Sequence, residues 1–493
     1  MENHQDEKYN TDATELLTLD EEETPDPKNP NKNDKGPIKL SRKTRLILFF
    51  FVISTELFMN NSSGLLSSAS VAIKKEFNIG DKDFGLLGTS QGIGRVLGNL
   101  LYIYFNNKLS SKYILSFSMI IKGTLAIIFK FSSNFNVLVY VRGIVAIFRM
   151  PGNIYCGVWI DQFGIQKYKT VMMSTIPMVQ TVGKLLGFFI HLIVGEDNWS
   201  NGFIIQGTLL ISIGVILLCF PHRYYSHKIK AVEKTEDDKD TPTDFEYIEN
   251  TRYVRNRKNK SQLSKLLSDV HELFSNPVWA ISMIGRAILY GLTTTIHFWE
   301  SDYMKNVINI KDQKEVFMMY SVIALLGPLG GVICNSLVNP VIGGYEKKKA
   351  SYAAIILHLA EVFCGMSMAF LRQKNLFLIL TVLYFLFDAS VIGILNGINI
   401  SSVRPQLKAT GFSITNLITH SLFAGPGPYI YGFVNDKYKD KFLGAGMLFM
   451  MIICACDIPI FIIMTIIRNR RIDLKEKEKL EKLMNQDGGE GKN

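Results

Sequence analysis

Residues 136–158, NVLVYVRGIVAIFRMPGNIYCGV, decide the fold that we expect of this chain. The stretch is apolar and long enough to cross a bilayer, which takes about 20 residues, yet it carries Arg142 and Arg149. A charge at the centre of a membrane helix costs roughly 2.5 to 3.5 kcal/mol even on the lenient insertion scale, so it is expected to face a bundle interior and mark a binding site. Four more such charges lie in other apolar stretches: Arg95, Lys122, Lys184 and Arg286. The pattern predicts a polytopic membrane protein that handles an anion.

The same criterion predicts an all-α membrane protein with twelve spans. Charged residues gather in the two tails, the middle and the short turns, which is typical of membrane proteins. The predicted spans are residues 46–70, 84–106, 113–131, 136–158, 170–194, 201–220, 278–298, 316–338, 350–371, 374–395, 409–433 and 443–467.

An even number of spans places both termini on one side of the membrane. The basic segments KLSRKTR, YEKKK and RNRR fall on that side, which the positive-inside rule makes cytosolic. No cleavable signal peptide is expected, because residues 1–38 are polar. Within them DATELL (12–17) resembles an acidic dileucine sorting signal, so we expect an endosomal, lysosomal or other vacuolar membrane rather than the plasma membrane.

The charge pattern also predicts the domain organisation. The second and eighth predicted spans are both glycine-rich and both end in a basic turn, which indicates a duplicated body. Duplicated halves of this kind place a substrate site at the membrane midplane. The predicted parts are a disordered cytosolic tail (1–44), an N-terminal six-helix bundle (45–220), a cytosolic linker with an amphipathic helix (221–275), a C-terminal six-helix bundle (276–468) and a cytosolic C-terminal tail (469–493).

Several functions are excluded by composition. The net charge of +10 is dispersed among short turns without interleaved aromatic residues, so no nucleic-acid partner is expected. All six cysteines fall inside predicted spans, without a disulfide framework or zinc-ligand spacing. The motif GTSQG (88–92) lies in a membrane span and not in the strand-turn-helix of a nucleophile elbow. No ATP-binding loop, cofactor or metal site is expected, and the chain is not predicted to be an enzyme.

Four segments resemble the spinster-like branch of the major facilitator superfamily. They are IKKEFNIGDKDFGLLGTSQGIGRVLG (73–98), VRGIVAIFRMPGN (141–153), FWESDYM (298–304) and SSVRPQLKATGFSITNLITHSLFAGPGPYIYGF (401–433). The resemblance runs from about residue 45 to 467. It implies the major facilitator fold with two pseudo-symmetric bundles, and transport of lysophospholipids, sphingoid phosphates or related organic solutes, often from lysosomes and often with protons.

The chain departs from the family pattern at three places. Ser62 and Ser63 stand where the family usually has an Asp-Arg pair, and Asn107 stands where an aspartate is expected. Arg149 replaces a glutamate that many members carry. The resemblance therefore does not transfer the family's usual proton-coupling carboxylates to this chain.

The superfamily's cavity is lined by spans one, two, four, five, seven, eight, ten and eleven. On these spans the chain carries five basic residues (Arg95, Arg142, Arg149, Lys184 and Arg286) and two acidic ones (Glu56 and Asp388), an excess of 5 − 2 = 3 positive charges. Buried charge without a partner is too costly to persist, so a water-filled cavity with an anionic substrate is expected. The predicted substrate-binding residues are Arg149, Arg95, Lys184 and Arg286, with Asn416 and His420.

Other roles stay open for some of these residues. Glu56 and Asp388 are candidates for proton coupling, but Glu56 can instead pair with Arg95 or Lys184, and Asp388 with Arg286. Arg142 is interpreted as a gating or structural residue, although its spacing of seven from Arg149 predicts similar directions on one helix. Gly425, Pro426 and Pro428 are expected to bend the eleventh span. The charges on supporting spans, Lys122, Glu361 and Asp457, are interpreted as structural.

We therefore expect a monomeric secondary active transporter that carries a small organic anion, or an amphiphile with an anionic headgroup, by alternating access. Its expected partners are that small-molecule or lipid anion, the bilayer and coupled protons. The alternative is a receptor or scaffold that keeps the fold without transporting. A membrane enzyme is the weakest alternative, because the sequence offers no nucleophile-base or metal constellation.

Overall fold

A computed structural model describes residues 42–106, 110–163, 169–219, 262–404 and 407–490. The dileucine-like stretch, Asn107 and most of the predicted linker lie outside these residues. The described residues form helices and turns, without a strand. The predicted all-α class is therefore confirmed for the described part of the chain.

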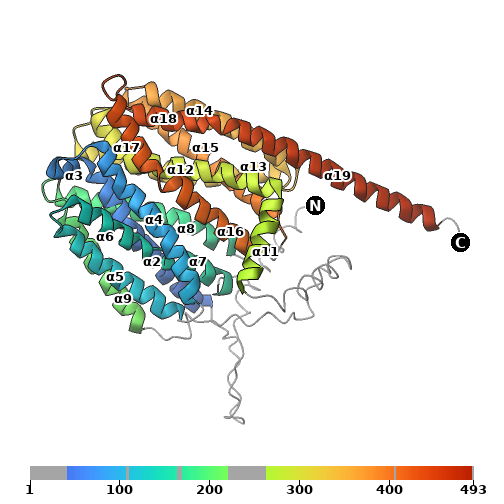
Figure 1. Ribbon diagram of the computed structural model, residues 1–493, viewed down its shortest axis with the longest axis horizontal. Coiled ribbons are helices and arrows are strands. Elements are labelled where there is room, and N and C mark those ends of the chain that lie inside the picture. Colours follow the sequence, from blue (N-terminus) through green and yellow to red (C-terminus); the bar gives the residue numbers. More distant parts are fainter. Residues whose placement is uncertain (1–41, 107–109, 164–168, 220–261, 405–406, 491–493) are drawn as a thin grey trace, which may run out of the picture. The chain divides into compact units, whose positions relative to one another are not determined.

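The first run of helices precedes the predicted linker. It comprises α2 (Arg42–Ser68), α3 (Ser70–Phe77), α4 (Asp81–Asn106), α5 (Ser111–Lys130), α6 (Phe135–Ile147), α7 (Met150–Phe163), α8 (Lys169–Val194) and α9 (Asn201–Cys219). In Figure 1 the blue and green helices α4, α5, α6 and α9 of this run lie beside one another.

The second run follows the predicted linker. It comprises α11 (Gln262–Ser275), α12 (Pro277–Asn306), α13 (Gln313–Ile342), α14 (Lys348–Phe370), α15 (Lys374–Ser401), α16 (Lys408–Ile418), the π-helix η4 (Thr419–Ala424), α17 (Gly427–Tyr438), α18 (Ala445–Cys456) and α19 (Ile458–Glu490). Each predicted span coincides with one helix or with consecutive helices. Among the described residues, eight helices are long and apolar enough to span a membrane. Neither α4 nor α12, which bear polar side chains toward the cavity, is among those eight.

Three spans are interrupted, and a proline accompanies each interruption. The fourth span breaks between α6 and α7 at Phe148 and Arg149, two residues before Pro151. The twelfth breaks between α18 and α19 at Asp457, two residues before Pro459. A proline has no N–H to donate, and its ring clashes with the carbonyl four residues earlier. Each of these two breaks also carries a charged residue, Arg149 in the fourth span and Asp457 in the twelfth.

The eleventh span changes helix type where the sequence predicts a bend. After α16 it continues as the π-helix η4, and α17 begins at Gly427 after a turn at Gly425 and Pro426. The break in the fourth span lies between Arg142 and Arg149, whose spacing of seven assumes one continuous helix. The two guanidinium groups still lie within electrostatic range of each other, although their hydrogen-bond partners differ.

Glycines set the packing of α4 on two sides. A Cβ added at Gly92 would lie 2.2 Å from the Cα of Gly425, so α4 and η4 cross with their backbones in contact. A Cβ at Gly94 would lie 2.1 Å from the carbonyl oxygen of Gly143 on α6. Distances this short leave room only for hydrogen, as in the small-residue contacts of membrane helices. Helix α4 therefore joins the first run of helices to the second.

The end of the predicted linker and the predicted C-terminal tail both form helices. On α11, Leu273 is buried against Trp279 and Leu407, whereas Leu267 and Phe274 are exposed. This helix therefore packs one side onto α12 and α16, and its exposed side carries Leu267 and Phe274 among the polar residues Ser264, Ser268 and His271. The segment predicted as a C-terminal tail continues α19 as a helix to Glu490.

Candidate functional site

A cavity lies between the two runs of helices. Arg95 of α4 and Lys184 of α8 line it from the first run, and Thr294 and His297 of α12 and Tyr320 of α13 line it from the second. The empty space along it measures about 500 Å³ when the part open to solvent is counted, but the cavity volume itself is only about 50 Å³. Small-molecule sites measure about 300 to 1,000 Å³. In this arrangement the cavity is therefore smaller than a site that holds an organic solute, and two cationic side chains lie at its wall.

Arg149 lies next to this cavity, at the break of the fourth span. Its Nη2 donates a hydrogen bond to the Oδ1 of Asn60, while its buried Nη1 has no hydrogen-bond partner among the described residues. The Nδ2 of Asn60 donates to Glu56 at 3.0 Å, and Gln180 donates to the same carboxylate oxygen at 2.9 Å. Arg95, Arg149 and Glu56 all lie within electrostatic range of one another.

Glu56 does not form the ion pairs that the sequence left open. Within the described residues no salt bridge joins Glu56 to Arg95 or Lys184. The side-chain amides of Asn60 and Gln180 donate to its Oε1 instead. The Glu56 carboxylate is thus near Arg95 and Arg149, but its hydrogen bonds are with the neutral amides of Asn60 and Gln180. The Nε of Arg95 is also buried without a partner in the described part of the chain.

Two of the predicted substrate-binding residues, Arg286 and Asn416, form a hydrogen bond with each other. The Nη2 of Arg286 donates to the Oδ1 of Asn416 at 3.2 Å, and the guanidinium lies 5.6 Å from the ring centre of Phe412. The alternative pairing of Arg286 with Asp388 is wrong. Asp388 accepts a hydrogen bond from Thr293 at 2.8 Å and lies within range of Glu361 instead.

The remaining predicted residues lie around these groups. His420 is buried in η4, with its ring edge toward Tyr290 at 5.7 Å between centres. Arg142 donates to Gln91 at 3.0 Å and to Ser63 at 3.4 Å. Gly425 contacts Gly92, Pro426 follows it in the turn, and Pro428 packs against Gly88.

Glu300 is a functional candidate that the sequence analysis missed. Its side chain is fully buried, its Oε2 lies 3.1 Å from the Nδ1 of His297, and its Oε1 has no hydrogen-bond partner in the described residues. Lys184 lies within electrostatic range. The predicted seventh span ends at residue 298, two residues before Glu300. The absence of glycine and proline between 299 and 306 was the available signal that the helix continues.

Ion pairs join the two runs where α4 begins, which we call the Asp81 end. Lys74 lies 2.7 Å from Asp81 and 2.5 Å from Asp302 of α12. Asp436 of α17 accepts hydrogen bonds from the backbone N–H groups of Asp81 and Lys82, at 3.2 and 2.8 Å. Burial lowers the pKa of Lys74, but the carboxylates of Asp302 and Asp81 outweigh burial and raise it above its usual value.

Aromatic contacts lie between these ion pairs and the cavity. Phe188 of α8 stacks on Tyr320 of α13 with 3.8 Å between ring centres, and Phe84 lies 5.1 Å from Phe298. The indole N–H of Trp299 donates to the carbonyl of Pro428 at 3.0 Å. Together with the ion pairs, these rings close the cavity at the Asp81 end.

Comparison with known proteins agrees with this architecture. The family description "Major Facilitator Superfamily" matches residues 46–428. A probable sphingolipid transporter, spinster homolog 1 of Arabidopsis thaliana, is 21% identical over 383 residues, covering 76% of each chain. A glucose-6-phosphate exchanger of Danio rerio is 25% identical over 285 residues, covering 53% of this chain and 54% of the exchanger.

Solved structures show the same fold. A bacterial homologue of the human lysosomal transporter spinster, in an inward-facing and unoccupied conformation, superposes with a TM-score of 0.70 at 13% identity, over 86% of this chain and 98% of that one. A D-xylose-proton symporter superposes with a TM-score of 0.61 at 12% identity, over 84% and 97% of the two chains. The predicted fold class and the resemblance to spinster-like transporters are confirmed. With most of its length matched by the family, this chain belongs to the major facilitator superfamily and is a multi-pass membrane transporter, not an enzyme.

Proposed function

We propose that the chain is a secondary active transporter of an organic anion, or of an amphiphile with an anionic headgroup. The observation that carries the proposal is a set of buried guanidinium nitrogens that have no hydrogen-bond partner among the described residues: Nε of Arg95, Nη1 of Arg149, and Nε and Nη1 of Arg286. Arg95 lines the cavity, and all three arginines lie within electrostatic range of His420. A buried polar group without a partner is costly, and an arginine fork matches carboxylate or phosphate oxygens. A bound anion supplies the missing acceptors.

The names of the relatives support this chemistry. One is a probable sphingolipid transporter and the other a glucose-6-phosphate exchanger, so one relative handles an amphiphile and the other a phosphate ester. In this proposal Arg95, Arg149 and Lys184 hold the anionic group from one half, and Arg286, Asn416 and His420 approach it from the other. The glycine and proline turn at Gly425, Pro426 and Pro428 bends as the halves move, while Arg142 braces α6 against α4.

In this proposal the cavity is reached from one side of the membrane at a time, and the Asp81 end is its closed side. Charge in the flanking segments assigns this end to the non-cytosolic side, so the cavity opens toward the cytosol. Both termini are then cytosolic, and the protein acts in an endosomal, lysosomal or other vacuolar membrane. The opposite state requires the Lys74, Asp302 and Asp436 contacts to break.

Coupling to protons is proposed at carboxylates buried within the membrane-spanning helices. Glu56 and Asp388 remain candidates, and Glu300 joins them because it lies near Lys184. A proton on Glu300 removes a negative charge that competes with the substrate for Lys184. Substrate and proton then bind together.

Flux and binding measurements on the purified protein test the proposal. The full chain in proteoliposomes is expected to take up glucose 6-phosphate or a short-chain sphingoid phosphate, and to reject glucose and sphingosine. The Arg95→Gln variant should lose most of this uptake, while Arg404→Gln, at an exposed position on the surface, should not. Anion binding without flux under any gradient would favour the receptor alternative. Equal uptake of the neutral compounds would contradict the anion assignment.

A further inference from the structure

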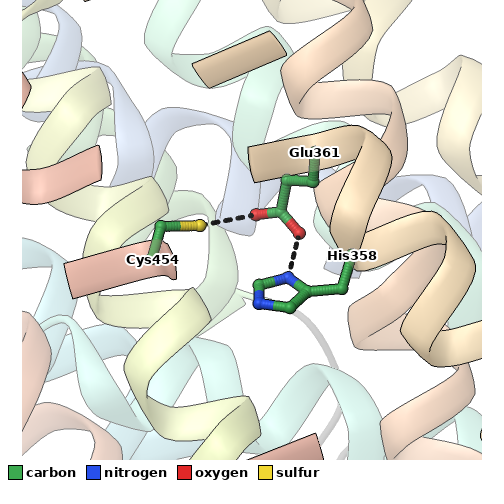
Figure 2. A group of neighbouring side chains, drawn as sticks. All are labelled: His358, Glu361 and Cys454. Atoms are coloured by element: carbon green, nitrogen blue, oxygen red, sulfur yellow. Dashed lines mark hydrogen bonds and ion pairs between the residues drawn. The ribbon is translucent and has the colours of Figure 1, made fainter. Parts of the chain in front are cut away.

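A second group of ionisable side chains lies apart from the cavity, between α14 and α18 (Figure 2). His358 and Glu361 lie one turn apart on α14, and Cys454 projects toward them from α18. Figure 2 shows the Glu361 carboxylate between the imidazole ring and the sulfur atom. One oxygen of Glu361 is 3.0 Å from the Nδ1 of His358, and the other accepts from the Sγ of Cys454 at 3.7 Å.

The cluster is closed to solvent. Exposed fractions are 1% for His358, 0% for Glu361 and 0% for Cys454, and their nearest nitrogen, oxygen and sulfur atoms all lie within 4.8 Å of one another. None of the three lines the cavity between the two runs of helices. The transport pathway proposed above therefore does not explain these side chains.

Negative charge in this region lacks a cation. Asp457 is 1% exposed and lies within electrostatic range of both His358 and Glu361. Both of its carboxylate oxygens are buried without a hydrogen-bond partner in the described part of the chain. No lysine or arginine forms a salt bridge with Glu361 or Asp457 among the described residues. Buried carboxylates without compensation are costly, so a bound cation would stabilise their ionised form.

The donor atoms identify the kind of cation. An imidazole nitrogen, a thiolate sulfur and a carboxylate oxygen are the ligands of zinc and related borderline divalent ions, whereas calcium and magnesium prefer oxygen alone. Zinc bonds of about 2.0 to 2.3 Å place tetrahedral ligand atoms roughly 3.5 Å apart. The 3.0 Å separation joins His358 to Oε2 of Glu361 and the 3.7 Å separation joins Cys454 to Oε1, while one ligand atom from each of the three residues lies within 4.8 Å of the others. The side chains must therefore move closer together around a bound metal ion.

Neighbouring residues fix the histidine as metal sites require. The ring of His358 stacks on Phe461 with 4.5 Å between centres and 10° between planes. Its Nε2 is buried without a partner in the described residues, and Asp457 lies nearby at the break between α18 and α19. Metal-bound histidines usually donate their second ring N–H to a carboxylate. Asp457 is placed to be that carboxylate when the metal occupies Nδ1.

We propose that the protein binds a zinc-class divalent ion through His358, Glu361 and Cys454, with Asp457 orienting His358. The ion stays bound while the transporter works, and it fixes α14 to the broken twelfth span. Its two positive charges offset the carboxylate of Glu361 and the thiolate of Cys454, whose thiol proton is released to solvent when the ion binds. Glu361 and Asp457 thereby gain a role more specific than general support of the bundle.

Cobalt substitution in the full-length purified protein tests the site. After treatment with a chelator, the protein is titrated with Co²⁺, whose bond to a thiolate gives a near-ultraviolet absorption band. We expect one Co²⁺ per chain with this band, and its loss when Zn²⁺ is added. Absence of the band in the wild type, or failure of Zn²⁺ to displace it, would overturn the proposal.

Variants separate this site from other thiols. Cys454→Ser and His358→Gln should abolish the band, while Cys156→Ser, which removes a buried cysteine of the first run, should keep it. A band that persists in Cys454→Ser would contradict the assignment. If either variant misfolds, X-ray absorption of the zinc-loaded wild type decides. One sulfur and two or three nitrogen or oxygen neighbours at about 2.0 to 2.3 Å support the site, and an all-oxygen shell overturns it.

Discussion

Arg149 combines features that set it apart from the other cavity cations. It stands at a helix break, where the family usually has an acid, and it reaches Glu56 only through Asn60. Part of its guanidinium has no protein partner among the described residues. In the proposed function, this part of the guanidinium binds the substrate anion.

Reversal of this charge tests its role. Arg149→Glu is expected to lower anion uptake at least about 100-fold, because it removes charge-assisted hydrogen bonds of about 1.5 to 3 kcal/mol each and adds repulsion. Uptake into proteoliposomes measures the effect, and gel filtration checks the fold. Arg149→Lys should retain part of the activity, since it keeps the charge and loses the fork. Unchanged uptake in Arg149→Glu would remove this residue from the site.

Glu300 provides a second test at the residue scale. If its proton accompanies the substrate, wild-type anion binding strengthens as the pH falls and Lys184 is released. In Glu300→Gln the side chain is permanently neutral, so binding should become nearly independent of pH, and a proton gradient should no longer drive uptake. Calorimetric binding across a pH series measures this. As a control, Glu315→Gln, outside the cavity on α13, should keep the wild-type pH response. A pH response retained in Glu300→Gln would assign coupling to another carboxylate.

At the scale of elements, proline and glycine residues control where the helices break and cross. The sequence predicts the bend at Gly425–Pro428, and the structure has the π-helix and turn there. It does not predict the break at Phe148 and Arg149, two residues before Pro151, because hydrophobicity continues across it. A proline inside an apolar stretch indicates such a break only when its missing N–H and its ring are considered.

The crossing of α4 and η4 carries its own prediction. Gly92→Ala should destabilise the protein by about 1 to 3 kcal/mol, because the new methyl group would overlap the Gly425 backbone. Gly157→Ala is the matched control. An added Cβ there meets nothing within 4 Å, and alanine favours a helix over glycine. Thermal unfolding in detergent should therefore show a lower midpoint for Gly92→Ala alone. Equal midpoints would mean that the crossing relaxes without cost.

At the scale of the whole molecule, the proposed mechanism gives the Asp81 end control over which side of the membrane reaches the cavity. Lys74, Asp302 and Asp436 connect helices from both runs. In that mechanism these contacts break in the opposite access state, so they favour the arrangement described above. Their free energy contributes to the balance between the two access states.

Asp302→Asn should shift that balance. It removes one carboxylate from Lys74, whose hydrogen bond to a charged group contributes about 1.5 to 3 kcal/mol, so opening at the Asp81 end should increase about tenfold or more. Labelling of Ser67→Cys in the cavity with a membrane-impermeant thiol reagent from the Asp81 side measures the opening. Asp473→Asn, which breaks an exposed ion pair elsewhere, should leave labelling unchanged. Equal labelling rates in Asp302→Asn and Asp473→Asn would show that the contact between Lys74 and Asp302 does not control opening at this end.

The sequence by itself determined that this chain is a helical membrane protein, where its spans lie and which spans carry cations. Hydrophobicity and charge are local properties, and the cost of burying an unpaired charge applies to any membrane helix. Only the tertiary structure decided which carboxylate meets which cation. Glu300 near Lys184, Asp388 away from Arg286, and Cys454 beside His358 depend on contacts between distant helices. Such contacts follow from helix packing, which no local pattern of residues encodes.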